Sequence, residues 1–128
     1  MSEKFTVEII SPENSIINTS TSEVIIPSFE GEMGILKDHI PLITFLRPGI
    51  ITLKDVSEKK FFVEEGTVEF SNNNLLVLTY TAKELSDIGK KTLDNLMIEA
   101  KQKLSDENIT DKEKFLQSYK IDTLKNLI

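Results

Sequence analysis

The chain changes character near Ala82, and this change constrains the fold more than any other feature of the 128 residues. All four prolines and four of the five glycines lie before that residue. Such residues mark turns and disfavour helix interiors. The segment after Ala82 instead carries apolar residues at helical spacing. We therefore predict two domains, one over residues 1–82 and one over residues 83–128.

The first domain is predicted to be an antiparallel β-sandwich of about eight to ten short strands, because short β-branched runs alternate with turn signals and no helical stretch intervenes. KFTVEII at residues 4–10 shows the alternation of a half-buried strand. In SEVIIPS at residues 22–28, Pro27 is expected to end the strand. RPG at residues 47–49 is expected to form a turn in which Pro48 fixes φ and Gly49 permits a positive φ.

The second domain is predicted to be an antiparallel hairpin of two helices. The first helical pattern begins at Leu85, and a break follows in SDENIT, residues 105–110. Thr110 and Glu113 fit a capping box, which marks the start of the second helix. Each helix has a single apolar stripe, so the two stripes are expected to bury each other. Such a hairpin would be marginal alone and able to pack on the sandwich or to detach.

Composition argues against several classes of function. A net charge of -6 disfavours nucleic-acid binding, which needs a basic surface to neutralise phosphates. One histidine and no cysteine cannot supply the ligands of a zinc site. GKKT at residues 89–92 is not the end of a phosphate-binding loop, because Glu84 stands where that loop needs glycine. No apolar run is long enough for a signal peptide or a membrane-spanning helix.

The segment with the most unusual composition is GEMGILKDHIPLITFLRPG, residues 31–49, which holds the only histidine and the only arginine. A Ser-His-Asp triad around His39 is disfavoured, because no nucleophile motif accompanies it. We expect His39 to be a hydrogen-bonded structural residue rather than an acid or base. Glu64 and Glu65 are interpreted as a solvated strand end. We predict no catalytic residue and no metal site, and so no enzyme.

The same segment closely resembles a hallmark of the ε subunit of F-type ATP synthases, called δ in mitochondria. The pattern is Gly-Glu-x-Gly-Ile/Val-x-x-x-His-x-Pro-Leu, followed by Leu-x-Pro-Gly. It is matched without a gap by Gly31, Glu32, Gly34, Ile35, His39, Pro41, Leu42, Leu46, Pro48 and Gly49. VEIISPE, SEVIIPSFEGE and FFVEEGTVEFSNNNLLVLTYTA resemble other strands of the family. The family usually has Gly-Gly where this chain has Glu65-Gly66, so the turn there is expected to be kept by Gly66.

The resemblance implies a non-catalytic rotor subunit at the foot of the central stalk, which passes rotation driven by protons or sodium to the catalytic head. Its implied partners are the γ subunit and the ring of c subunits, with α and β contacted through the hairpin. It implies contacts by Glu32, Met33, Ile35, His39 and Thr44, and a loop shaped by Gly31 and Gly34. The implied location is the cytoplasmic face of a bacterial membrane, reached only through the complex.

The hairpin departs from relatives that bind ATP. Those relatives carry Ile/Leu-Asp-x-x-Arg-Ala early in the first helix, whereas this chain reads IGKKTL at residues 88–93, without the Asp or the Arg. We therefore expect no cofactor and no ATP binding. Lys90, Lys91, Lys101 and Lys103 replace the arginines of inhibitory relatives only as point charges, so weak inhibition is expected. The alternative function is a free-standing β-sandwich binding module whose helices dock another partner.

Overall fold

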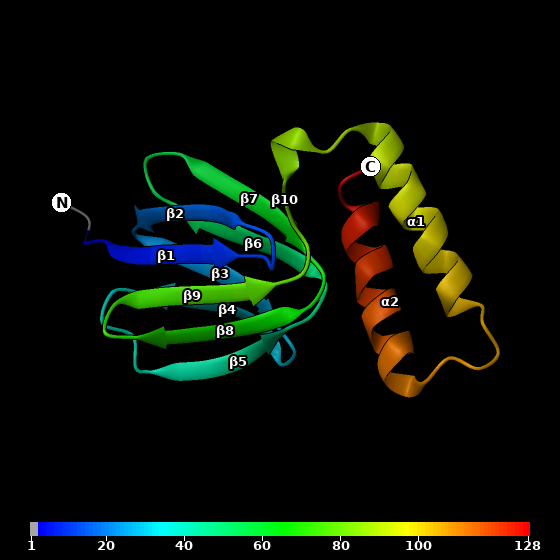
Figure 1. Ribbon diagram of the computed structural model, residues 1–128, viewed down its shortest axis with the longest axis horizontal. Coiled ribbons are helices and arrows are strands. Elements are labelled where there is room, and N and C mark those ends of the chain that lie inside the picture. Colours follow the sequence, from blue (N-terminus) through cyan, green and yellow to red (C-terminus); the bar gives the residue numbers. More distant parts are fainter. Residues whose placement is uncertain (1–2) are drawn as a thin grey trace.

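The computed structural model describes residues 3–128 and confirms a β-sandwich followed by two helices (Figure 1). Within these residues the strands are β1 (Phe5–Ile10), β2 (Ser15–Thr21), β3 (Glu23–Ser28), β4 (Gly31–Leu36), β5 (Leu42–Leu46), β6 (Gly49–Lys54), β7 (Glu58–Val63), β8 (Gly66–Ser71), β9 (Asn74–Thr79) and β10 (Ala82–Glu84). A 3-10 turn, η1 (Leu85–Asp87), leads to α1 (Lys90–Leu104) and α2 (Asp111–Lys125). Strand pairing thus continues to Glu84, and the independence of the two domains stays a prediction.

The strands form two layers. One layer has the order β10-β7-β6-β3-β4 and the other has the order β5-β8-β9-β1-β2. The layers are joined where Ser28 of β3 pairs with Leu46 of β5. The pairings are antiparallel except that of β1 with β9, which is parallel and departs from the antiparallel sheet expected. β1 is the first strand in the sequence, and β9 is the latest strand of its layer in the sequence. No tight hairpin turn therefore has to join these two parallel strands.

The sandwich core follows from alternation along the strands. Every second side chain of a strand points to the same face, so each strand contributes one row to the interior. The buried core side chains are Phe5, Val7, Ile9, Val24, Ile26, Ile35, Leu46, Ile51, Leu53, Phe61, Val63, Val68, Phe70, Leu75 and Val77. Fully burying one such side chain contributes about 1.5–3 kcal/mol. The two layers are therefore held together chiefly by this apolar interior.

The expectation that Pro27 ends its strand is wrong, and Gly49 does not use the positive φ that glycine permits. β3 continues through Pro27, which pairs with Glu32 of β4. A proline is tolerated there because pairing with β6 has already stopped at Ile25, so no partner needs its missing N–H. Gly49 does not take a positive φ. It is required for close packing instead, since a Cβ at Gly49 would lie 2.6 Å from the Pro27 Cβ.

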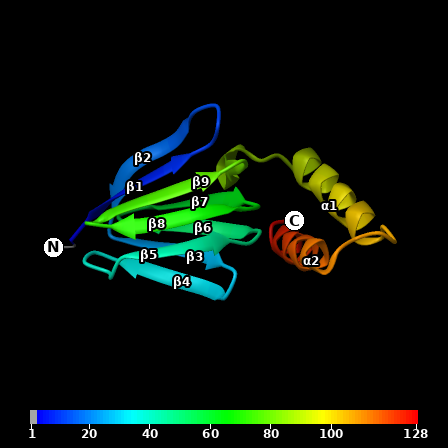
Figure 2. The same ribbon diagram turned by 60° about the horizontal axis from the view of Figure 1, so that its bottom comes forward.

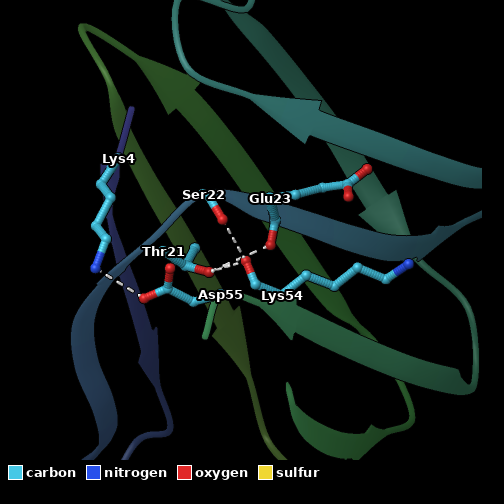
Figure 3. Close-up of polar contacts among 6 residues, drawn as sticks. All are labelled: Lys4, Thr21, Ser22, Glu23, Lys54 and Asp55. Atoms are coloured by element: carbon cyan, nitrogen blue, oxygen red, sulfur yellow. Dashed lines mark hydrogen bonds and ion pairs between the residues drawn. The ribbon is translucent and has the colours of Figure 1, made fainter. Parts of the chain in front are cut away.

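Hydroxyl groups at the β2–β3 corner fix the end of β6 (Figure 3). Thr21 Oγ1 and Ser22 Oγ both donate to the Lys54 carbonyl at 2.8 Å. Lys4 pairs with Asp55 at 2.9 Å on the neighbouring surface. Lys54 is the last residue of β6, and the two hydroxyls supply hydrogen bonds to its carbonyl where the strand ends.

The helical hairpin differs from expectation at its start and in its packing. The first helix begins at Lys90 rather than at Leu85, because Gly89 adopts an extended conformation as its N-cap. α2 begins as expected, with Glu113 N donating to Thr110 Oγ1 at 3.1 Å. The apolar stripes of the two helices contact the sandwich as well as each other. Phe62 points away from the sandwich core and packs with Leu93 and Leu124 in a second apolar cluster.

The second cluster explains why β7 has three consecutive buried residues, Phe61, Phe62 and Val63. Phe61 and Val63 face the sandwich core, and Phe62 faces the helices. The hairpin lies at one end of the sandwich, where α2 stands between the strands and α1 in Figure 1 and next to the strand ends in Figure 2. α2 is therefore the helix through which most of the docking is made.

Candidate partner-binding surface

The segment around Glu32 is a strand and not a loop, which corrects the expectation from the sequence. β4 lies at the edge of its layer and pairs with β3. Glu32 is exposed and Met33 is half-buried against the core. Ile35 has no exposed surface, so it is a core residue and the expected partner contact by Ile35 is wrong. Glu32 remains available to a partner at this edge.

Gly31 and Gly34 have different roles. Gly31 has a φ of 132°, a conformation that L side chains rarely adopt, and it starts β4 directly after the β3–β4 turn. Ser28 Oγ donates to the Gly31 carbonyl at 2.6 Å and closes this turn. Gly34 lies in mid-strand beside Ile25, so it does not shape a loop as expected. The turn therefore depends on Gly31.

The β4–β5 connection, which contains His39, is held in place by Asn73 of the β8–β9 turn. Asn73 Nδ2 donates to Asp38 Oδ1 at 2.9 Å, and Asp38 N donates to Asn73 Oδ1 at 2.7 Å. His39 is half-buried, with Nδ1 2.7 Å from the Ile40 carbonyl and its ring edge-on to Phe70 at 5.9 Å. These contacts support the structural interpretation of His39. A contact between His39 and a partner stays a prediction.

Thr44 has exposed neighbours that the sequence reasoning missed. Thr44 is half-buried and pairs with Val68, on the same face of β5 as Leu46. The opposite face presents Ile43 and Phe45, which are 75% and 58% exposed. β5 is thus apolar on both faces, although one of its faces is open. The run PLITFL carried this signal, because a strand with one solvated face normally has polar residues on it.

We define the apolar patch as Ile43, Phe45, Leu78 and Tyr80, all of which are exposed. Phe45 pairs with Thr67, and Thr67 pairs with Leu78, so Phe45 and Leu78 lie in one row across β5, β8 and β9. A groove of about 460 Å³ opens at the hairpin end of this row. Its lining includes Ile10, Pro12, Phe29, Phe45, Leu78, Tyr80 and Lys112. Contiguous apolar surface of this kind marks an interaction site.

The charges around the patch are mostly negative. In the row next to Phe45, Ile43 pairs with Glu69, and further along the same row Leu76 pairs with Glu8. Glu65 and Lys112 stand at the groove. An apolar anchor surrounded by basic groups would therefore complement this surface.

The remaining glycines and prolines of the expected motif keep strands close. A Cβ at Gly66 would collide with the carbonyl oxygen of Leu78 on the neighbouring strand, so Gly66 allows β8 and β9 to pair. Pro48 is buried in the β5–β6 turn, and Pro41 is exposed just before β5. These residues shape the scaffold behind the patch.

Two features that would suggest other functions, a metal-binding cluster and a membrane-spanning helix, are absent from the described residues. Among residues 3–128, no group of three His, Asp or Glu side chains is arranged to hold a metal ion. No helix in the same range has the length and apolarity needed to cross a bilayer. Glu64, interpreted as a solvated strand end, instead pairs with Lys120 of α2 at 2.6 Å.

Comparison with known proteins gives a family match over the sandwich and relatives over the whole chain. Residues 4–85 match the family described as ATP synthase, Delta/Epsilon chain, beta-sandwich domain. The ATP synthase epsilon chain of Pelagibacter ubique is 48% identical, over 99% of both chains. That of Allorhizobium ampelinum is 33% identical over 92% of both chains.

Solved structures share the fold at lower identity. A chain in the structure described as Euglena gracilis mitochondrial ATP synthase, OSCP/F1/c-ring, superposes with a TM-score of 0.79 and 19% identity. That match covers 96% of this chain and 80% of the other. A chain of the Tetrahymena thermophila mitochondrial ATP synthase central stalk and c-ring has a TM-score of 0.65 and 13% identity. The fold described above is therefore a known one.

Proposed function

We propose, since this chain belongs to the family of ATP synthase delta/epsilon chains, that it is the non-catalytic rotor subunit which joins the central stalk to the c ring. In this role it would transmit ion-driven rotation to the catalytic head without doing chemistry itself. The observation that carries the proposal is the apolar patch on a rigid sandwich. Torque transmission needs a grip of complementary shape, and buried apolar anchors supply most of the energy of such a contact.

The γ subunit is the proposed occupant of the patch. Solved chains of this fold come from structures whose descriptions name a c ring, and one of the two descriptions also names the central stalk. Ile43 and Phe45 project from a strand held on both sides, by β8 and by the Ser28–Leu46 pairing. Their rigid support favours a contact that does not slip under load.

The c ring is proposed to meet the edge of β4 at Glu32. Among the described strands, β3 is the one partner of β4, and Glu32 is exposed on β4. Met33 is half-buried beside it, so an apolar contact would accompany the charge. Family resemblance motivates this assignment, and the open edge supports it. The chain would thereby lie at the cytoplasmic face of a bacterial membrane, attached through the complex.

No cofactor is included in the proposal. The hairpin lacks the Asp and Arg of the ATP-binding motif, and Gly89 and Thr92 stand at those two positions around the start of α1. Titration calorimetry with ATP that showed micromolar binding would contradict this part of the proposal.

The test is binding of the full chain to the γ subunit of its own organism, measured by titration calorimetry. In the double variant Ile43→Asp, Phe45→Asp, each change places a carboxylate in the proposed contact. An anchor residue is worth about 2 kcal/mol, or about 30-fold in affinity, so we expect the double variant to lose at least this much.

The matched control is Val56→Asp, because Val56 is 98% exposed and lies outside the patch. Its affinity should equal that of the unmodified chain. If the double variant binds γ as tightly as this control, the patch is not the γ contact. If the unmodified chain does not bind γ, the rotor function itself fails.

A further inference from the structure

An unbroken chain of contacts links the sole arginine of the protein to α2. The Arg47 guanidinium lies 3.9 Å from the centre of the Tyr119 ring. Tyr119 packs against Phe115, one helical turn earlier, with ring centres 4.8 Å apart. Phe115 stacks on Phe29 at 5.3 Å with an interplanar angle of 14°. We call Phe29, Arg47, Phe115 and Tyr119 the aromatic latch.

Hydrogen bonds to the backbone join the two sandwich members of the latch, Phe29 and Arg47, to each other's turns. Arg47 Nε donates to the Ser28 carbonyl at 2.9 Å, and Phe29 follows Ser28 in the chain. The backbone of the same two turns is joined again, because Arg47 N donates to the Pro27 carbonyl and Phe29 N donates to the Phe45 carbonyl. Both sandwich members of the latch are thus held by hydrogen bonds within the sandwich that do not involve the helix. A preorganised site loses little side-chain entropy when its partner docks.

Other polar contacts between hairpin and sandwich also come from α2. Lys120 pairs with Glu64 at 2.6 Å, and Thr123 Oγ1 lies 3.5 Å from the Pro48 carbonyl. Within residues 3–128, no hydrogen bond, ion pair or ring contact joins α1 to a strand. In the described part of the chain, α1 packs on the sandwich at the apolar cluster around Phe62.

We propose that the aromatic latch sets whether the hairpin is docked, and that Arg47 is its positioning residue. The guanidinium contributes twice, through the face of Tyr119 and through Ser28, so its loss frees both the helix and the turn. A partly desolvated cation–π contact between Arg47 and Tyr119 corresponds to about tenfold in the equilibrium between docked and released α2. This inference concerns the chain itself and does not require the γ contact proposed above.

Amide hydrogen exchange of the full chain, followed by mass spectrometry, tests the latch, because exchange reports opening even when the open form is rare. Arg47→Gln and Tyr119→Leu are each expected to speed exchange in α2 about tenfold. Tyr119→Phe keeps the ring and should stay within about twofold of the unmodified chain. Exchange in β8 and β9 should not change.

The double variant Arg47→Gln, Tyr119→Leu distinguishes a latch from two separate defects. Its effect should be smaller than the product of the single effects, since both changes break the same contact. Lys59→Gln is the charge-matched control, because Lys59 is exposed on β7. Unchanged α2 exchange in Arg47→Gln, equal acceleration of α2 and the sandwich, or independent effects in the double variant would each overturn the proposal.

Discussion

At the scale of single residues, Lys120 is a buried charged side chain that the sequence reasoning did not single out. It lies in the helical half of the chain, where lysines look like a solvated face, yet it is only 3% exposed. Its ammonium group is paired with Glu64, which itself seemed to be a solvated strand end. Removing one partner of a buried pair leaves a charge without compensation and costs more than the pair contributes.

Glu64→Gln should therefore destabilise the protein by about 1–3 kcal/mol, less than for a fully buried pair because the Glu64 side chain is 29% exposed. Urea unfolding followed by circular dichroism measures the change. Adding Lys120→Met should restore most of the loss, since no unpaired charge then remains. Asp55→Asn, in the more exposed pair with Lys4, should cost less than about 1 kcal/mol. Equal losses for Glu64→Gln and Asp55→Asn would contradict this interpretation.

At the scale of elements, the sequence predicted most strands, the two helices and the cap at Thr110, because periodicity and capping are local signals. It missed β4, since GEMGIL has two glycines and looks like a loop. Only pairing with β3 makes this segment a strand. It also missed Ile43 and Phe45 as surface residues, because which face of β5 is covered depends on the other layer.

The β3–β4 turn provides the prediction at this scale. Gly31→Ala should destabilise the protein by about 1–3 kcal/mol, because an alanine is strained at a φ of 132°. Gly34→Ala is the control, since its Cβ would meet only the Glu23 carboxylate at 3.4 Å, an ordinary contact. Its cost should stay below about 1 kcal/mol. Thermal unfolding compares the two variants, and equal shifts would show that the positive φ is not the reason for Gly31.

At the scale of the whole molecule, the sandwich separates two tasks. The outer face of β5, β8 and β9 carries the apolar patch, while the turns after β3 and β5 carry the aromatic latch. The groove between them is lined by Phe45 from the patch, by Phe29 from the latch and by Lys112 from the hairpin. A partner on the patch would therefore lie close to the docked helix. Tertiary proximity of this kind has no local sequence signal.

The central claim is that this chain couples rotation through the apolar patch. The most direct measurement is the membrane potential generated by ATP hydrolysis in vesicles that carry the complete complex, followed with a voltage-sensitive dye. We predict that the Ile43→Asp, Phe45→Asp chain lowers the potential generated per ATP hydrolysed by about tenfold or more, while Val56→Asp leaves it unchanged. A complex containing the double variant that pumps as well as the Val56→Asp complex would contradict the claim.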